Sequence, residues 1–114
     1  MKIIHKESKK LIGERIKVAS SFKDRIKGLM FRDTMGDMDG LLIENSNSIH
    51  NCFVKFPIDV VFLSRDFKVI KIIRSFKPWR FSWIYFGATR VLELPANSLP
   101  EDIGKGDFLE VVHV

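Results

Sequence analysis

The chain has only one cysteine, Cys52, among its 114 residues, so no disulfide can form within it. Nothing in its cysteine content therefore requires an oxidising compartment. No window approaches the ~18 consecutive apolar residues of a membrane-spanning helix. The charged N-terminal stretch 1–11 also lacks the apolar run of a signal peptide. These absences predict a soluble, cytoplasmic protein.

Catalytic and metal-binding motifs are also missing. The chain contains no phosphate-binding loop, no nucleophile elbow, no Cys-x-x-Cys and no His-Glu-x-x-His. His50 and Cys52 stand two residues apart, a spacing that could form a nucleophile pair or two metal ligands. A third group is needed, and neither His5 nor His113 is predictably near. A buried cysteine beside a hydrogen-bonded histidine is the simpler interpretation, and we predict no catalytic residue, metal or cofactor.

Short apolar segments separated by turn residues dominate the chain. Its length fits one domain, residues 1–114, and its ten phenylalanines with frequent Ile and Val favour strands. We expect strands at 2–7, 10–19, 40–44, 49–54, 58–63, 69–73, 88–94 and 108–113. This pattern indicates a mostly β (α+β) fold, a compact barrel-like or rolled antiparallel sheet.

One main helix is expected near residues 22–30. Ser21 followed by Asp24 is a helix-capping pattern, with an acid three residues after the cap. Beyond it, Phe22, Ile26 and Leu29 fall on one helical face together with Met30. The helix should therefore pack one apolar side against the sheet.

Several segments carry a family resemblance when taken together in this order. They are Arg25-x-x-Gly28-Leu29-Met30-Phe31-Arg32, Gly40–Ile43, the long motif 48–62, Lys77–Arg80, Val91–Ala96 and Gly104-x-Gly106-Asp107. Over about residues 13–114 the chain resembles domain-of-unknown-function family 192, an uncharacterised bacterial and archaeal family. Asn97, Cys52 and Val54 depart from the family's usual residues. The resemblance implies a fold, and it implies no reaction.

Asp59 lies inside an otherwise apolar strand and must find hydrogen-bond donors if it is buried. The natural partner is a guanidinium, from Arg25 on the predicted helix or from Arg32. The pair would either fix the helix on the sheet or form the polar floor of a ligand pocket. Glu93, in the strand 91–94, raises the same question.

The stretch 76–86 is the most unusual part of the sequence, because six of its eleven residues are aromatic. Trp79 and Trp83 stand near Lys77 and Arg80, and residues 67–92 contain six Lys or Arg and no acid. Exposed rings with cations suit single-stranded nucleic acid, sugar rings or a membrane interface. Alternatively, half of these rings belong to the core.

The leading hypothesis is a non-enzymatic, monomeric domain that binds a small molecule or glycan through Lys77, Trp79, Arg80 and Trp83. The first alternative is single-stranded nucleic-acid binding through the basic window 68–80, with Lys68, Lys71, Arg74, Lys77 and Arg80. The second is an enzyme that uses His50, Cys52 and Asp59. The sequence does not identify the ligand or partner.

Overall fold

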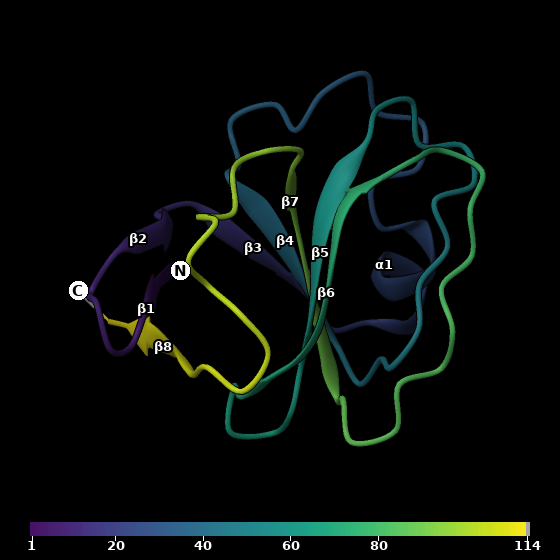
Figure 1. Cartoon of the computed structure of the whole chain (residues 1–114). Coiled ribbons are helices and arrows are strands. Elements are labelled where there is room, and N and C mark those ends of the chain that lie inside the picture. The colour runs from purple at the N-terminus through teal and green to yellow at the C-terminus, as the bar shows by residue number, and fades with distance from the viewer. Residues whose placement is uncertain (114) are drawn as a thin grey trace.

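The computed structural model describes residues 1–113, apart from the side chain of Phe22. It consists of two sheets and one short helix (Figure 1). The elements are β1 (Lys2–His5), β2 (Leu11–Gly13), β3 (Ile16–Ala19), α1 (Phe22–Lys27), β4 (Gly40–Glu44), β5 (Ile58–Leu63), β6 (Val69–Phe76), β7 (Arg90–Pro95) and β8 (Leu109–Val112).

The larger sheet has five strands in the order β3-β4-β7-β5-β6, and the smaller has three in the order β2-β1-β8. Strand β3 runs parallel to β4, whereas every other pair is antiparallel. Parallel neighbours need a crossover connection, and here the connection contains α1. The helix therefore lies on one face of the five-stranded sheet, and the three-stranded sheet lies on the other side (Figure 1).

Two apolar cores follow from this layering. On β5, Val60 and Phe62 belong to the core on the α1 side, while Val61 and Leu63 belong to the core shared with the three-stranded sheet. A strand covered on both faces buries every side chain, and its residues are apolar except where, as at Asp59, a polar group finds hydrogen-bond partners. This explains the continuous run in β5, whose six residues are all buried.

The predicted mostly β fold with one short helix is confirmed, with three differences. Among residues 1–113 the strand pairing leaves two open sheets and closes no barrel. One strand pair is parallel, a long-range choice that alternation along a strand cannot indicate. The helix starts as expected, with Ser21 Oγ accepting from Asp24 N, but it ends before Gly28, whose φ of 46° is left-handed. The expected apolar contact of Phe22 lies outside the described residues.

Asp59 is buried, as predicted, but the expected ion pair with Arg25 or Arg32 is wrong. Its Oδ1 accepts from Ser75 N at 2.9 Å and its Oδ2 accepts from Leu99 N at 3.2 Å. The reason is strand parity, because Asp59 points to the same side as Val61, away from α1. Asp59 therefore joins β5 to the end of β6 and to the loop after β7.

We expect Asp59→Ala to lower the free energy of unfolding by about 2–5 kcal/mol, because it leaves two N–H groups without their acceptor. Asp59→Asn keeps one acceptor oxygen and should cost less. Urea unfolding measures both, with the exposed Asp66→Ala as the control. An Asp59→Ala variant as stable as the Asp66→Ala control would contradict this role.

Candidate functional site

A cavity of about 260 Å³ lies between α1 and the five-stranded sheet. Arg25, Gly28 and Leu29 line it from the helix and its C-terminal end, and the segment 45–50 closes another side. Ile43 of β4 and Glu93 of β7 contribute from the sheet. The cavity is therefore a consequence of the crossover that places α1 over this face.

Glu93 is the buried acid of this cavity. On β7 it stands opposite Leu41 of β4 and Val60 of β5, so its side chain points to the α1 side of the sheet. A Cβ placed on Gly28 would lie 3.7 Å from its Oε1, which puts the carboxyl directly beneath the end of α1. Burial raises the pKa of Glu93 to about 8. The side chain is therefore mostly a neutral carboxylic acid at pH 7.

Two polar atoms at this cavity are buried without a hydrogen-bond partner among the described residues: Oε1 of Glu93 and Nε of Arg25. The guanidinium is held from its other side, where Nη1 donates to the Asn45 carbonyl at 3.2 Å. Buried polar groups are almost always satisfied, and each unmet one costs about 1–3 kcal/mol. One carboxyl oxygen and one guanidinium nitrogen of the cavity lining therefore have unused hydrogen-bonding capacity.

His50 lies at the edge of the same cavity. Its Nδ1 accepts from the backbone N–H of Cys52 at 3.2 Å, so the histidine caps a turn. Its ring lies 6.3 Å from that of Phe81. The segment 49–54, expected as a strand, makes only an isolated bridge between His50 and Phe81.

The residues of the enzyme hypothesis do not converge. His50 lies on the α1 side of the five-stranded sheet, and Asp59 points to the opposite side, where its two oxygens bind backbone N–H groups. Cys52 is half-buried beside His50, and the hydrogen bond between the two residues runs from the Cys52 backbone N–H to His50 Nδ1. It does not involve the Cys52 thiol. Among the described residues no group of three or more His, Cys, Asp or Glu is arranged to hold a metal ion.

The four aromatic and basic residues of the leading hypothesis are all on the surface. Trp79, Arg80 and Trp83 are exposed, as is Lys77, and none of the four lines the cavity. Their segment instead supports the cavity wall. Trp79 N donates to the Asn51 carbonyl at 2.9 Å and Asn51 N donates to the Arg80 carbonyl at 2.8 Å.

The basic window of the nucleic-acid hypothesis is divided in the fold. The guanidinium of Arg74 donates to the carbonyls of Leu99, Pro100 and Ile103, on the side of the three-stranded sheet. Lys68 forms a bridge with Phe108 next to β8. The five cations therefore form no single track along one face.

A polar triad that the sequence did not predict joins two turns. His5 Nδ1 lies 2.6 Å from Ser8 Oγ, and its Nε2 lies 3.1 Å from Asp107 Oδ2. Each outer member also binds its own turn, through Lys10 N to Ser8 Oγ and Gly104 N to Asp107 Oδ2. Residues 102 positions apart carry no local signal of this contact. The triad ties the β1–β2 turn to the turn before β8.

The fold and the cavity define the class of protein: a two-sheet β domain in which a crossover helix covers a cavity with a buried acid. The chain belongs to domain-of-unknown-function family 192, described as uncharacterized ACR, whose family model matches residues 3–111. The resemblance seen in the sequence is therefore confirmed. No helix among the described residues is long and apolar enough to cross a membrane.

Curated relatives come from two archaea. A UPF0127 protein of Thermococcus sibiricus is 31% identical over 99 residues, which are 83% of this chain and 64% of that protein. The chain thus spans less than two thirds of that relative. The UPF0127 protein PH1112 of Pyrococcus horikoshii is 37% identical over 105 residues, 89% of this chain and 90% of that protein.

Two solved bacterial structures share the fold. One is a protein of unknown function from Novosphingobium aromaticivorans, with a TM-score of 0.80, 21% identity, and 97% of this chain and 84% of that chain covered. The other, from Sinorhizobium meliloti, is described as a candidate transcription regulator. Its TM-score is 0.78 at 23% identity, and the match covers 96% of this chain and 89% of that chain. At this identity the likeness shows the fold alone.

The raised pKa of Glu93 predicts a specific pH dependence of stability. Between pH 4.5 and about 8 the folded protein keeps a proton that the unfolded chain has released, so stability falls as pH rises. The slope is at most ~1.4 kcal/mol per pH unit. Glu93→Gln mimics the neutral acid and cannot ionise, so its stability should lack this pH dependence.

Chemical unfolding of both proteins at several pH values tests this. The difference between their unfolding free energies isolates Glu93, because other titrating groups contribute equally to the two curves. The free energy of unfolding of Glu93→Gln, relative to that of wild type, should rise steadily from pH 4.5 to about 8. Parallel curves would show that the carboxyl ionises normally.

Proposed function

We propose that this chain is a non-enzymatic domain that binds a small, neutral, hydroxyl-bearing ligand of the carbohydrate type in the cavity beneath α1. The observation that carries the proposal is the pair of buried polar atoms at the cavity, Glu93 Oε1 and Arg25 Nε, which have no partner among the described residues. Folding has already removed water from these two atoms. A ligand that supplies their partners therefore forms hydrogen bonds without a further desolvation cost on the protein side.

A sugar hydroxyl suits this pair because it donates and accepts at once. The neutral carboxylic acid of Glu93 can accept through Oε1, and Arg25 Nε donates. Ile26, Leu29 and Val54 supply apolar surface for the carbon face of a sugar ring. The volume of about 260 Å³ lies just below the usual range of ligand pockets, about 300–1,000 Å³, and so favours a single ring over a long chain.

The aromatic and basic loop supports the site from outside. Its residues 79–82 hydrogen-bond to residues 49–51, which adjoin the cavity, and Ser82 Oγ accepts from Ile49 N at 2.8 Å. Phe81 packs beside His50 at the cavity edge. The loop thus fixes the wall of the cavity without lining it.

Binding is favoured over catalysis because the sheet separates His50 from Asp59, as described above. The nucleic-acid alternative draws on the description of the Sinorhizobium meliloti protein as a candidate transcription regulator, and the division of its cations between separate parts of the fold weakens it. That alternative predicts affinity that falls steeply with salt, which sugar binding does not.

The test is a screen of monosaccharides and short glycans by ligand-observed NMR, followed by calorimetry of any hit. Glu93→Gln should bind within a few-fold of wild type, because an amide also donates and accepts. Glu93→Leu fills the same space without polar atoms and should bind at least ~10-fold more weakly, about one lost hydrogen bond. Trp83→Ala, on the outer surface, is the matched control and should bind like wild type.

Three results would contradict the proposal. One is the absence of any sugar hit with folded wild-type protein. A second is a hit whose affinity survives in Glu93→Leu, which would place binding elsewhere. The third is salt-dependent binding of single-stranded oligonucleotides, with no sugar binding.

A further inference from the structure

Seven large apolar side chains are exposed on one side of the molecule and are here called the aromatic face. They are Phe31, Phe53, Trp79, Phe81, Trp83, Ile84 and Phe86, and their exposed fractions run from 46% for Phe53 to 86% for Phe86. The rings form a chain of contacts at one end, because Phe53 lies 5.2 Å from Phe31 and 4.6 Å from Trp79. Apolar surface gathered in this way marks an interaction site in a protein that otherwise buries such residues.

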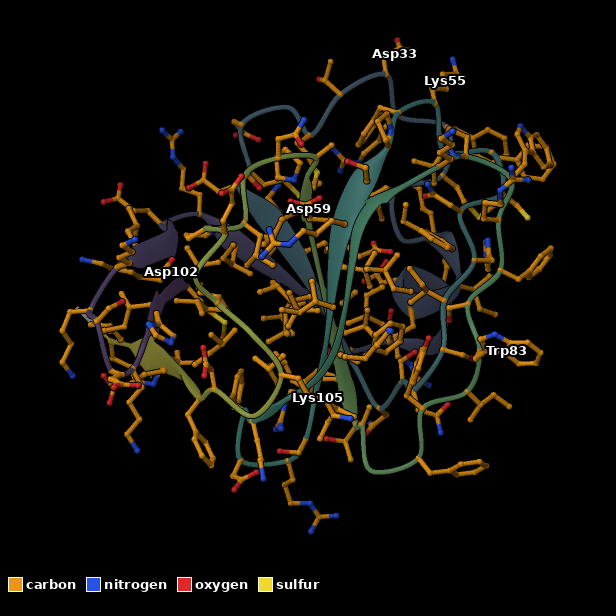
Figure 2. All side chains as sticks on the ribbon, in the orientation of Figure 1. Asp33, Lys55, Asp59, Trp83, Asp102 and Lys105 are labelled. Atoms are coloured by element: carbon orange, nitrogen blue, oxygen red, sulfur yellow. The ribbon has the colours of Figure 1, made fainter. Side chains whose placement is uncertain are left out.

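The strip 79–85 presents these rings outward. It pairs with residues 47–51 through Trp79 N, Ser82 N and Tyr85 N. Trp79, Phe81 and Trp83 are exposed, whereas Ser82 between them turns its hydroxyl to Ile49 N. In Figure 2 the labelled Trp83 projects away from the body of the molecule, beyond the segment that covers α1. The rings stand on an outer edge and do not line a groove.

The backbone is strained at the first three of these aromatic residues. Phe31, Phe53 and Trp79 have φ values of 66°, 60° and 62°, a left-handed conformation that is an outlier for bulky residues. Backbone hydrogen bonds enforce it, from Phe31 N to the Phe53 carbonyl and from Trp79 N to the Asn51 carbonyl. Glycine would meet the same geometry without strain. Three aromatic residues at such positions, all exposed, indicate that the rings serve something other than folding.

Cations accompany the rings. Arg80 is exposed on the strip 79–85 and Lys77 is exposed just before it, and among the described residues neither is in an ion pair. Residues 67–92 contain no acid that would cancel their field. The surface therefore combines an apolar edge with two cations that form no ion pair among the described residues.

We infer that the aromatic face binds the surface of an anionic lipid bilayer. Tryptophan and phenylalanine enter the boundary between headgroups and acyl chains, and Lys77 and Arg80 reach the headgroup phosphates. A projecting edge suits a bilayer, whereas a small ligand needs a concave site. This interaction uses the outer side of the strip, and it is independent of ligand binding in the cavity.

The chain carries its own reporter for this interaction, because both of its tryptophans, Trp79 and Trp83, lie on the aromatic face. Vesicles of equal parts phosphatidylglycerol and phosphatidylcholine should shift the tryptophan emission to shorter wavelength. Lipids brominated in the acyl chain should quench it. Vesicles of phosphatidylcholine alone should bind more weakly, and salt should reduce the difference between the two.

Glycine variants separate binding from folding. Trp79→Gly and Phe53→Gly remove a ring and relieve the left-handed strain, so the melting temperature should change little while vesicle partitioning falls about 10-fold or more. Trp83 remains as the fluorophore in both. Phe108→Ala, an exposed ring beside β8, is the matched control and should bind like wild type.

Two charge-reversal variants complete the design. Lys77→Glu should weaken binding to anionic vesicles by about 10-fold at low salt. Lys105→Glu, in a turn on the other side of the five-stranded sheet, should have a much smaller effect, and Figure 2 labels Lys105 far from Trp83. The comparison distinguishes a local contact from a general effect of net charge.

Three outcomes would overturn the inference. The first is wild-type protein whose emission and sedimentation are unchanged by anionic vesicles. The second is vesicle binding that survives in both glycine variants. The third is a dimer in solution, measured by analytical ultracentrifugation, that Trp79→Gly dissociates and that excludes vesicles, because the face would then join two copies of this chain.

Discussion

Strand β3 runs parallel to β4, and two parallel neighbours can be joined only by a connection that passes over one face of their sheet. In this chain the connection begins with six helical residues, which lie above the middle of a five-stranded sheet. The position of α1 sets the depth of the cavity and places the end of the helix directly over Glu93. The loops 45–57 and 77–87 then complete this side of the domain, so the cavity and the aromatic face both depend on one parallel pairing.

Two buried acids show how the faces of this sheet differ. Asp59 of β5 and Glu93 of β7 are on adjacent strands, but they point to opposite faces. Asp59 accepts from two backbone N–H groups, which fix the position of its carboxylate. Glu93 Oε1 has no such donor among the described residues, and burial raises the pKa of the carboxyl to about 8. The first acid therefore organises the fold, whereas the second lies at the cavity beneath α1.

The outer side of the molecule differs from the cavity in that it exposes aromatic residues, some of them in a strained backbone conformation. Folding places apolar side chains inside and glycine at left-handed positions, because both choices lower the free energy. Phe53 and Trp79 depart from both tendencies at once, since each is left-handed and exposed. The cavity offers hydrogen bonds in a confined space, and the aromatic face offers apolar surface with positive charge. The two features therefore lie on different parts of this side of the domain, since none of the exposed rings of residues 79–86 lines the cavity.

Local patterns in the sequence determined the elements of this protein. Alternation and turn residues located most strands, Ser21 and Asp24 located the start of the helix, and an acid inside an apolar strand predicted the burial of Asp59. Glu93 stood in the same kind of pattern. The exposed rings of Trp79 and Trp83 were candidates from composition alone.

Tertiary structure decided which of these residues meet. Strand parity tells which residues share a face, but it does not tell which face the helix covers. That choice depends on the parallel pairing of β3 with β4, a long-range contact with no local signature. For this reason the sequence predicts Arg25 or Arg32 as the partner of Asp59, whereas its donors are the backbone N–H groups of Ser75 and Leu99, and the acid beneath the helix is Glu93. The contact of His5 with Asp107 likewise exists only because the fold brings the two ends of the chain together.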